Sequence, residues 1–442
     1  MDGTQGPTCG RANASACLFL LLVAMGSHVR ADDAPPSPAE PRVARLIREL
    51  GAPEYATRER ANARLSEFGE ETREQLEQAL EHEDLEVRLR AGRLLDDLKV
   101  DQLWRASRVE FAAEGATASQ ALAALARQSG NHIHIGDPYG NFADGKLDAD
   151  VGPMDYWQAV DQICDRAGNR IRPHYDMHTP GIVVSAGAPP RYPRAYGGPV
   201  RGEITEARRV FIEELKYEEQ RAELTHSFQV NLKFGWEDRF QIVGYASQPE
   251  LVEAVTDNHV VCSPAQPSGS AWNATTRGLR QVTANLKLNP VPITAKSFAV
   301  FTVRWGLIAV GEPAVLEIDD FESKRTFAQD DVAATVVSVE RGPAAKISLT
   351  LNVTRDLSMP DPREVIFQEY SVDVLDADGR KFRVQSQSPS LSDGGVQLKL
   401  TLSGESPDSE PKLIKLHYPR LRSRRNVELT FRDVPLPTGR PE

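Results

Sequence analysis

One short pattern is written twice between residues 117 and 173, and this duplication limits the possible folds more than any other feature. Residues 117–134 and 155–172 align without a gap. Gln120 aligns with Gln158, and the pair Gly130-Asn131 aligns with Gly168-Asn169. The duplication predicts two similar strand–helix–strand units that form one α+β module.

Each copy carries signals for the start and the end of a helix. Thr117 followed by Gln120 is a capping box, and Asp155 followed by Gln158 is its relative. A glycine closes each helix at the position where a left-handed backbone is favoured. Apolar side chains recur at the spacing of one helical face, so we expect each helix to bury that face: Ala118, Ala121, Leu122 and Leu125 in the first copy, and Tyr156, Ala159, Val160 and Ile163 in the second.

A short alternating run follows each Gly-Asn pair. Residues 132–135 and 170–172 predict strands whose isoleucines point inward and whose histidines or arginines point outward. Further strand-like residues precede, separate and follow the two copies, at 109–111, 146–151 and 182–184.

The matching core and cap residues are Ala121, Leu122, Leu125, Ser129, Gly130, Ile133, Ile135, Ala159, Val160, Ile163, Ala167, Gly168, Ile182, Val183 and Val184. With this pattern, residues 108–186 resemble the secretin and TonB short N-terminal (STN) domain. The resemblance implies a periplasmic interaction module. No secretin ring domain follows in this sequence, so the family's role in export is not carried over.

Residues 42–100 show helical periodicity. Ala61, Leu65 and Phe68 have the spacing i, i+4, i+7, and residues 91, 95 and 98 repeat it. A further amphipathic helix is expected at 72–80. The stretch 82–91 resembles the second-helix consensus of HEAT repeats, which implies protein–protein interaction. A helical cap or spacer is the alternative, since about two repeats are present and such arrays usually need three.

The first residues predict export. Residues 16–25 are an unbroken apolar run, too short to cross a bilayer, and Val29 and Ala31 fit a signal-peptide cleavage site. We therefore expect a signal peptide at 1–31, a Pro-rich lead-in at 32–41, and no integral membrane segment in the mature chain. The expected location is periplasmic or extracellular. Cys164 and Cys262 remain after cleavage. They fall in different predicted domains, and Cys164 has the position of a buried small hydrophobe.

The periodicity changes to two after a Pro/Gly linker at 187–202. Regularly spaced alternating runs predict two β-sandwich domains, at 203–325 and 326–438. The predicted fold class is therefore multidomain: α, then α+β, then all-β. The chain has 52 Lys and Arg against 63 Asp and Glu, a formal net charge of -11, which argues against nucleic-acid binding.

The candidate metal ligands are histidines and acids. His132 and His134 share one strand face, with His174, Asp176 and His178 beyond the second copy. The two strand histidines align with Arg170 and Arg172, which favours plain surface positions. Calcium is an alternative for two acidic segments, but neither shows EF-hand spacing: the loop with Asp137, Asp144, Asp148 and Asp150, and the turn 376–379, where Asp-Gly is an ordinary hairpin signal.

Arginines and tyrosines in the expected linker could stack on a ligand or pack on neighbouring domains: Arg191, Tyr192, Arg194 and Tyr196. No common catalytic motif is present. The sequence thus favours an exported, non-enzymatic interaction or scaffold protein of the bacterial cell envelope. We expect it to bind a protein partner through the helical repeat and the STN-like module. No catalytic, cofactor-binding or metal residue is assigned, no cofactor is predicted, and the oligomeric state stays open. The alternative is a secreted carbohydrate-binding protein or hydrolase, with an acidic site and aromatics such as Trp236, Trp272 or Trp305.

Overall fold

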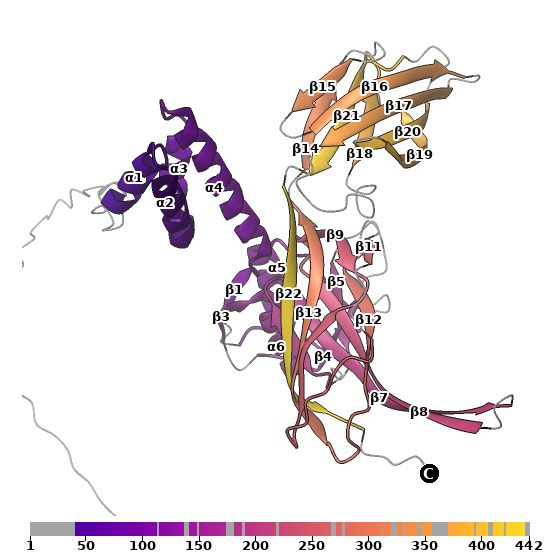
Figure 1. Cartoon of the computed structure of the whole chain (residues 1–442). Coiled ribbons are helices and arrows are strands. Elements are labelled where there is room, and N and C mark those ends of the chain that lie inside the picture. Colours follow the sequence, from indigo (N-terminus) through magenta and orange to yellow (C-terminus); the bar gives the residue numbers. More distant parts are fainter. Residues whose placement is uncertain are drawn as a thin grey trace, which may run out of the picture. The chain divides into compact units, whose positions relative to one another are not determined.

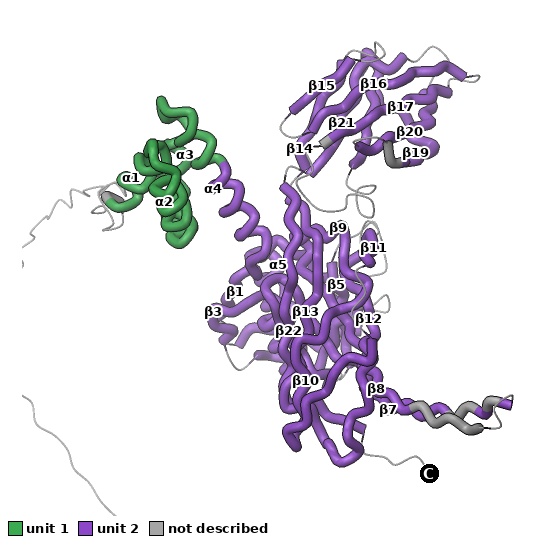
Figure 2. Tube along the Cα trace, in the orientation of Figure 1, with its two compact units in different colours: residues 1–92 green, residues 93–442 purple. Residues whose placement is uncertain are grey.

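The computed structural model describes residues 40–437 apart from 113–114, 137–140, 148–149, 174–180, 188–190, 218–220, 267–270, 276–278, 312, 320–324, 330–331, 343–345, 356–369, 393–394, 405–409 and 420. The expected signal peptide and nearly all of the lead-in lie outside this range. The described chain is rich in strands, with helices in its first part (Figure 1). It divides into two compact units, Met1–Gly92 and Arg93–Glu442 (Figure 2).

The first unit is helical. It contains α1 (Glu40–Glu49), α2 (Tyr55–Phe68), the 3-10 turn η2 (Gly69–Thr72), α3 (Arg73–Ala79) and the start of α4 (Leu85–Trp104). One contact occurs at both repeats. The Arg58 guanidinium donates to the carbonyls of residues 52 and 53, at 2.7 and 2.9 Å, and Arg88 donates to those of residues 82 and 83, at 2.6 and 2.9 Å. Each arginine therefore ties its helix to the loop before it.

The second unit begins with the α+β module. Its elements are β1 (Arg108–Phe111), α5 (Ala118–Ser129), β2 (Ile133–Ile135), β3 (Val151–Asp155), α6 (Tyr156–Ala167), β4 (Asn169–Pro173) and β5 (Ile182–Ala186). Strand β1 pairs with β3, and β5 lies between β2 and β4. The expected apolar faces of α5 and α6 form one core with Val109, Val151 and Val184.

The local signals of the first copy are confirmed. Thr117 and Gln120 form both hydrogen bonds of a capping box, and Gly130 and Gly168 adopt φ values of 70° and 71°. The second helix starts after Asp155, as expected, but the Asp155 side chain makes no cap hydrogen bond. Its carboxylate accepts a 2.9 Å hydrogen bond from Arg108 on the paired strand instead.

The strand face of β2 also departs from expectation. Ile133 packs against the module core, but the side chain of Ile135 is exposed. Of the two isoleucines in this run, only Ile133 is therefore packed against the core.

The first sandwich packs two sheets around a core rich in aromatic residues. One sheet has the order β12 (Gln281–Leu288), β8 (Arg221–Trp236), β7 (Val200–Lys216), β6 (Arg194–Gly197). The other has the order β10 (Glu250–Thr256), β13 (Ser297–Val310), β9 (Gln241–Ala246), β11 (Trp272–Ala274), and β22 (Arg422–Pro435) also pairs with β13.

The second sandwich has a separate core. Its three-stranded sheet contains β14 (Pro313–Ile318), β21 (Leu413–Pro419) and β18 (Ser371–Leu375). Its five-stranded sheet contains β15 (Thr326–Gln329), β16 (Val332–Arg341), β17 (Lys346–Arg355), β20 (Gly395–Ser403) and β19 (Arg383–Ser392).

Three boundaries differ from the predicted domain limits. Strand β6 and the start of β7 occupy part of the expected linker, because Ala195 and Val200 are buried in the first core. Strand β14 joins the second sandwich through β21. Strand β22 returns to the first sandwich, where Leu429 and Phe431 enter the core.

Among the described helices, none has the length and apolar character needed to cross a bilayer.

Candidate binding sites

Helix α6 is joined to the first sandwich by a buried cluster of charges. Asp161 is 3% exposed. Its carboxylate accepts two hydrogen bonds from Arg201 on β7, at 2.6 and 2.8 Å, and one from the Tyr196 hydroxyl on β6, at 2.8 Å. The indole of Trp157, one turn earlier on the helix, donates to the carbonyl of residue 199 at 3.0 Å. These contacts fix the helix on the edge of the sheet.

The same cluster continues into the sheet. Arg201 also lies 2.7 Å from a carboxylate oxygen of Glu203, whose other oxygen lies 3.0 Å from Lys233 on β8. Burial alone would raise the pKa of Glu203, but the charges of Arg201 and Lys233 outweigh it and lower that pKa. Burial likewise opposes the charge of Arg201, and the two carboxylates more than offset it, so the pKa of Arg201 is raised. Both shifts favour the charged forms of Glu203 and Arg201.

A pocket of about 270 Å³ opens beside this cluster. Its walls come from α6, β4, the segment before β6, and strands β7 and β8. The charged side chains that line it are Asp161, Arg170, Arg172, Arg194, Arg201, Glu203 and Lys233, with Tyr192 beside them. The arginines and tyrosines of the predicted linker have two different roles here. Tyr196 packs on the neighbouring domain, whereas Tyr192 and Arg194 line the pocket.

A second polar cluster joins the module to the sandwich at the end of β8. The carboxylate of Glu237 is fully buried. It accepts hydrogen bonds from the backbone and hydroxyl of Ser107, at 2.9 and 2.5 Å, from the amide of Asn131, at 3.1 Å, and from Arg239, at 2.9 Å. All of these donors are needed to satisfy a buried carboxylate, so we assign the cluster a structural role.

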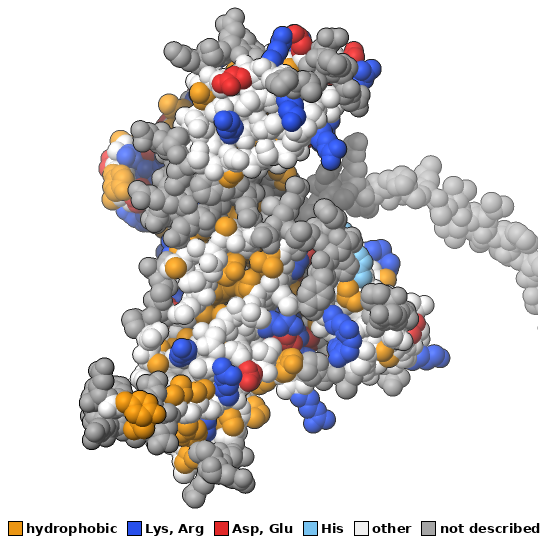
Figure 3. All heavy atoms as spheres, turned by 90° about the vertical axis from the view of Figure 1, so that its right-hand side faces the viewer, with side chains coloured by type: hydrophobic (Ala, Val, Ile, Leu, Met, Phe, Trp, Pro, Cys, Tyr) orange, Lys and Arg blue, Asp and Glu red, His pale blue; other side chains and the backbone are white. Residues whose placement is uncertain are grey.

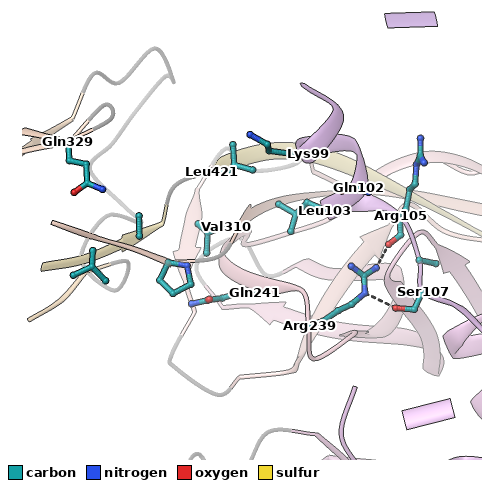
Figure 4. Close-up of a pocket in the computed structure, with 15 residues that line it drawn as sticks. Lys99, Gln102, Leu103, Arg105, Ser107, Arg239, Gln241, Val310, Gln329 and Leu421 are labelled. Carbon is teal, nitrogen blue, oxygen red and sulfur yellow. Dashed lines mark hydrogen bonds between the residues drawn. The ribbon is translucent and has the colours of Figure 1, made fainter. Parts of the chain in front are cut away.

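A larger pocket, of about 1070 Å³, is lined by the end of α4, the last residue of β13 and the start of β14 (Figure 4). Figure 4 shows the Arg239 guanidinium bound to the Arg105 carbonyl and to the Ser107 hydroxyl, the latter at 2.6 Å. The Arg239 guanidinium therefore already binds the segment that follows α4.

The candidate metal ligands fall partly inside the described residues. His132 Nδ1 lies 3.1 Å from Asp238, a carboxylate that also binds Arg280 at 2.7 Å. His174, Asp176 and His178 lie outside the described residues. No group of three His, Cys, Asp or Glu side chains able to hold a metal is found in the part of the chain that the structure describes.

The acidic segments have other roles where they are described. Asp144 accepts hydrogen bonds from the backbone and hydroxyl of Ser119, at 2.8 and 2.9 Å, and the backbone bond is the main reason why its pKa is lowered. Asp137 and Asp148 lie outside the described residues. The Asp376 carboxylate accepts two backbone hydrogen bonds inside its turn, each of 2.9 Å. Across this turn Leu375 and Lys381 form an antiparallel bridge, and Phe382 N donates to the carbonyl of Val374, so the expected hairpin is present before β19 joins the other sheet.

The aromatics of the carbohydrate alternative are largely unavailable to a sugar. Trp236 and Trp305 are 1% and 0% exposed and belong to the sandwich core. Trp272 is half-buried, with the Arg424 guanidinium 4.3 Å from its ring centre. The two carboxylates that line the smaller pocket both pair with Arg201.

A two-stranded ribbon projects from the first sandwich (Figure 1). Strand β6 pairs with β7 only up to residue 203, and β12 pairs with β8 only from residue 228. Beyond these limits β7 and β8 pair only with each other among the described strands. The ribbon carries exposed apolar side chains (Figure 3): Phe211, Ile212, Leu215 and Tyr217.

Both thiols are free and buried, as expected for Cys164. Sequence reasoning missed that Asp161, Arg201 and Glu203 form one cluster. The only local hint was a carboxylate on the apolar face of α6, between Trp157 and Cys164. No family model matches the chain, and neither a curated protein nor a solved structure shows significant similarity to it.

Proposed function

We propose that the chain is an exported, non-enzymatic interaction protein of the bacterial cell envelope, and that it binds an extended strand of a protein partner along the β7–β8 ribbon. The single observation that carries this proposal is the combination of free strand edges and exposed apolar side chains on one projecting element. An unpaired strand edge offers a row of backbone donors and acceptors to another chain. Strand addition to such an edge is a common mode of peptide recognition.

The ribbon is well suited to this role by its composition. Leu215 and Tyr217 are 53% and 83% exposed. Phe211 stacks on His226 of the opposite strand, with ring centres 4.3 Å apart, which stiffens the ribbon before its outer end. Backbone hydrogen bonds would provide affinity, and the apolar side chains would select a partner strand.

The helical unit offers a second apolar surface. Leu85 and Leu89 lie one turn apart on α4, and Leu80 lies close to Gly92 on the next turn. All three leucines are exposed. This stripe supports the proposal that the HEAT-like repeat and the STN-like module also take part in protein binding.

Photo-crosslinking in the cells that make the protein tests the proposal. A crosslinking amino acid at position 217 should capture one reproducible partner, and the same group at the exposed position 337 of the second sandwich should not. The double variant Ile212→Asp/Leu215→Asp should abolish capture. The matched variant Val337→Asp/Val384→Asp changes two other exposed apolar residues and should leave capture unchanged. Equal capture from positions 217 and 337, or capture that survives the ribbon variant, would refute the proposal.

Export rests on residues 1–31 and has its own test. N-terminal sequencing of the protein recovered from the envelope should find Asp32 as the first residue. An intact Met1 in that fraction would contradict cleavage at the predicted site.

A further inference from the structure

The pocket between α6, β4 and β7 has an excess of positive charge. Five cationic side chains line it, namely Arg170, Arg172, Arg194, Arg201 and Lys233, against two carboxylates, Asp161 and Glu203. Both carboxylates are held by Arg201, and Lys233 holds one of them as well. Arg194 is also paired, with Asp165 beside the pocket, so two cations remain in excess, in a protein with a formal net charge of -11. Such a pocket focuses a positive field on whatever enters it.

Arg170 and Arg172 carry this excess. They flank Ile171 on β4; all three residues line the pocket, and Ile171 also packs against the module core. The Nε atom of Arg170 is buried and has no hydrogen-bond partner in the described part of the chain. A buried donor without a partner is costly, and native proteins satisfy nearly all such groups. A bound acceptor would remove this cost.

We propose that this pocket binds the phosphate group of a small ligand. Guanidinium groups present planar pairs of donors that match the oxygens of phosphate in a bidentate way. An excess of two cations suits a dianion better than a single carboxylate. The volume of about 270 Å³ accepts a phosphate group with a small substituent, and Tyr192 at the pocket offers an aromatic face to that substituent. The proposal is independent of the ribbon.

Isothermal titration calorimetry with inorganic phosphate and with phenyl phosphate, at constant ionic strength, tests the proposal. Wild-type protein should bind at least one of them at millimolar concentration or below. The Arg170→Gln/Arg172→Gln variant should bind at least about tenfold more weakly, because it loses two charge-assisted interactions. The variant Arg383→Gln/Arg432→Gln removes the same charge from exposed positions elsewhere and should bind as wild type does.

Two further measurements make the result specific. The affinity for phenyl phosphate should rise between about pH 5 and about pH 8, because the dianion of a phosphate ester forms above its second pKa of about 6. Tighter binding of phenyl phosphate than of inorganic phosphate would identify an ester as the ligand class, and equal affinity would identify free phosphate. Should Arg170→Gln disturb folding, Arg172→Gln alone provides the same comparison. Binding of succinate in preference to both phosphates, no binding at all, or binding unchanged in the pocket variant would each overturn the proposal.

Discussion

Replacing Asp161 by asparagine should loosen α6 from the first sandwich by about 3 kcal/mol. Arg201 is 6% exposed and loses its closest carboxylate in this variant. Removing one partner of a buried ion pair typically costs about 3–5 kcal/mol, since the remaining charge stays buried. Glu203 continues to pair with Arg201, which places the expected cost at the lower end of that range.

Amide hydrogen exchange of peptides that cover α6 measures this effect in the full-length chain. A loss of about 3 kcal/mol corresponds to roughly a hundredfold faster exchange when the helix opens locally. Asp165→Asn is the matched control. Asp165 lies on the same helix and binds Arg194 at 2.7 and 3.0 Å, but it is exposed, so its loss should cost less than about 1 kcal/mol.

The double variant Asp161→Leu/Arg201→Met separates charge from packing. It removes both members of the buried pair and fills their space with apolar atoms, and such replacements are often neutral. Glu203 keeps Lys233 as its partner. We therefore expect slower exchange in the double variant than in Asp161→Asn. The reasoning would be refuted if the exchange rate of α6 rose less than about tenfold in Asp161→Asn. It would also be refuted if α6 exchanged as fast in the double variant as in Asp161→Asn.

Three other predictions concern pH, backbone strain and thiol reactivity. The pKa of Glu203 is lowered from its ordinary value of 4.5, so the stability that Glu203 contributes is present above pH 4.5 and is lost as the pH falls below that value. In a plot of Tm against pH, Glu203→Gln should therefore show a smaller decrease of Tm at acid pH. Gly168 has a φ of 71°, so Gly168→Ala should cost about 1 kcal/mol in urea unfolding, whereas Gly152→Ala, which meets no atom within 4 Å at an ordinary φ, should cost little. Burial raises the pKa of the Cys164 and Cys262 thiols, so peptide mapping should find both unlabelled by iodoacetamide until urea unfolds the chain.

Signals that act within a few residues were readable from the sequence. The Thr117 capping box and the glycine stops at 130 and 168 depend on neighbours in the chain, and all three form as expected. Asp155 failed as a cap because Arg108, which lies far away in the sequence, competes for its carboxylate. A local rule cannot weigh a partner that only the pairing of β1 with β3 brings close.

The limits of the sandwiches were beyond prediction for a related reason. Alternation identifies a strand and its buried face, but β14 and β22 alternate in the same way although they join different cores. Which sheet a strand joins depends on shape complementarity with partners remote in the sequence. The buried Asp161 cluster shares this property, since its three charged residues come from α6 and β7 and become a site only when the two elements meet.

The duplicated stretch shows where such non-local contacts develop. Asn131 and Asn169 occupy equivalent positions in the two copies, yet Asn131 donates to Glu237 of the sandwich while Asn169 hydrogen-bonds to the backbone of Ala143 inside the module. His132 lies against Asp238, whereas the aligned Arg170 lines the basic pocket. The alignment of histidine with arginine suggested two plain surface positions. His132 is exposed, as this alignment suggested, whereas Arg170 is half-buried. The copies thus share the residues that build the core and differ in the residues that contact other parts of the protein. The residues that distinguish the copies are therefore the ones to change when the basic pocket is tested.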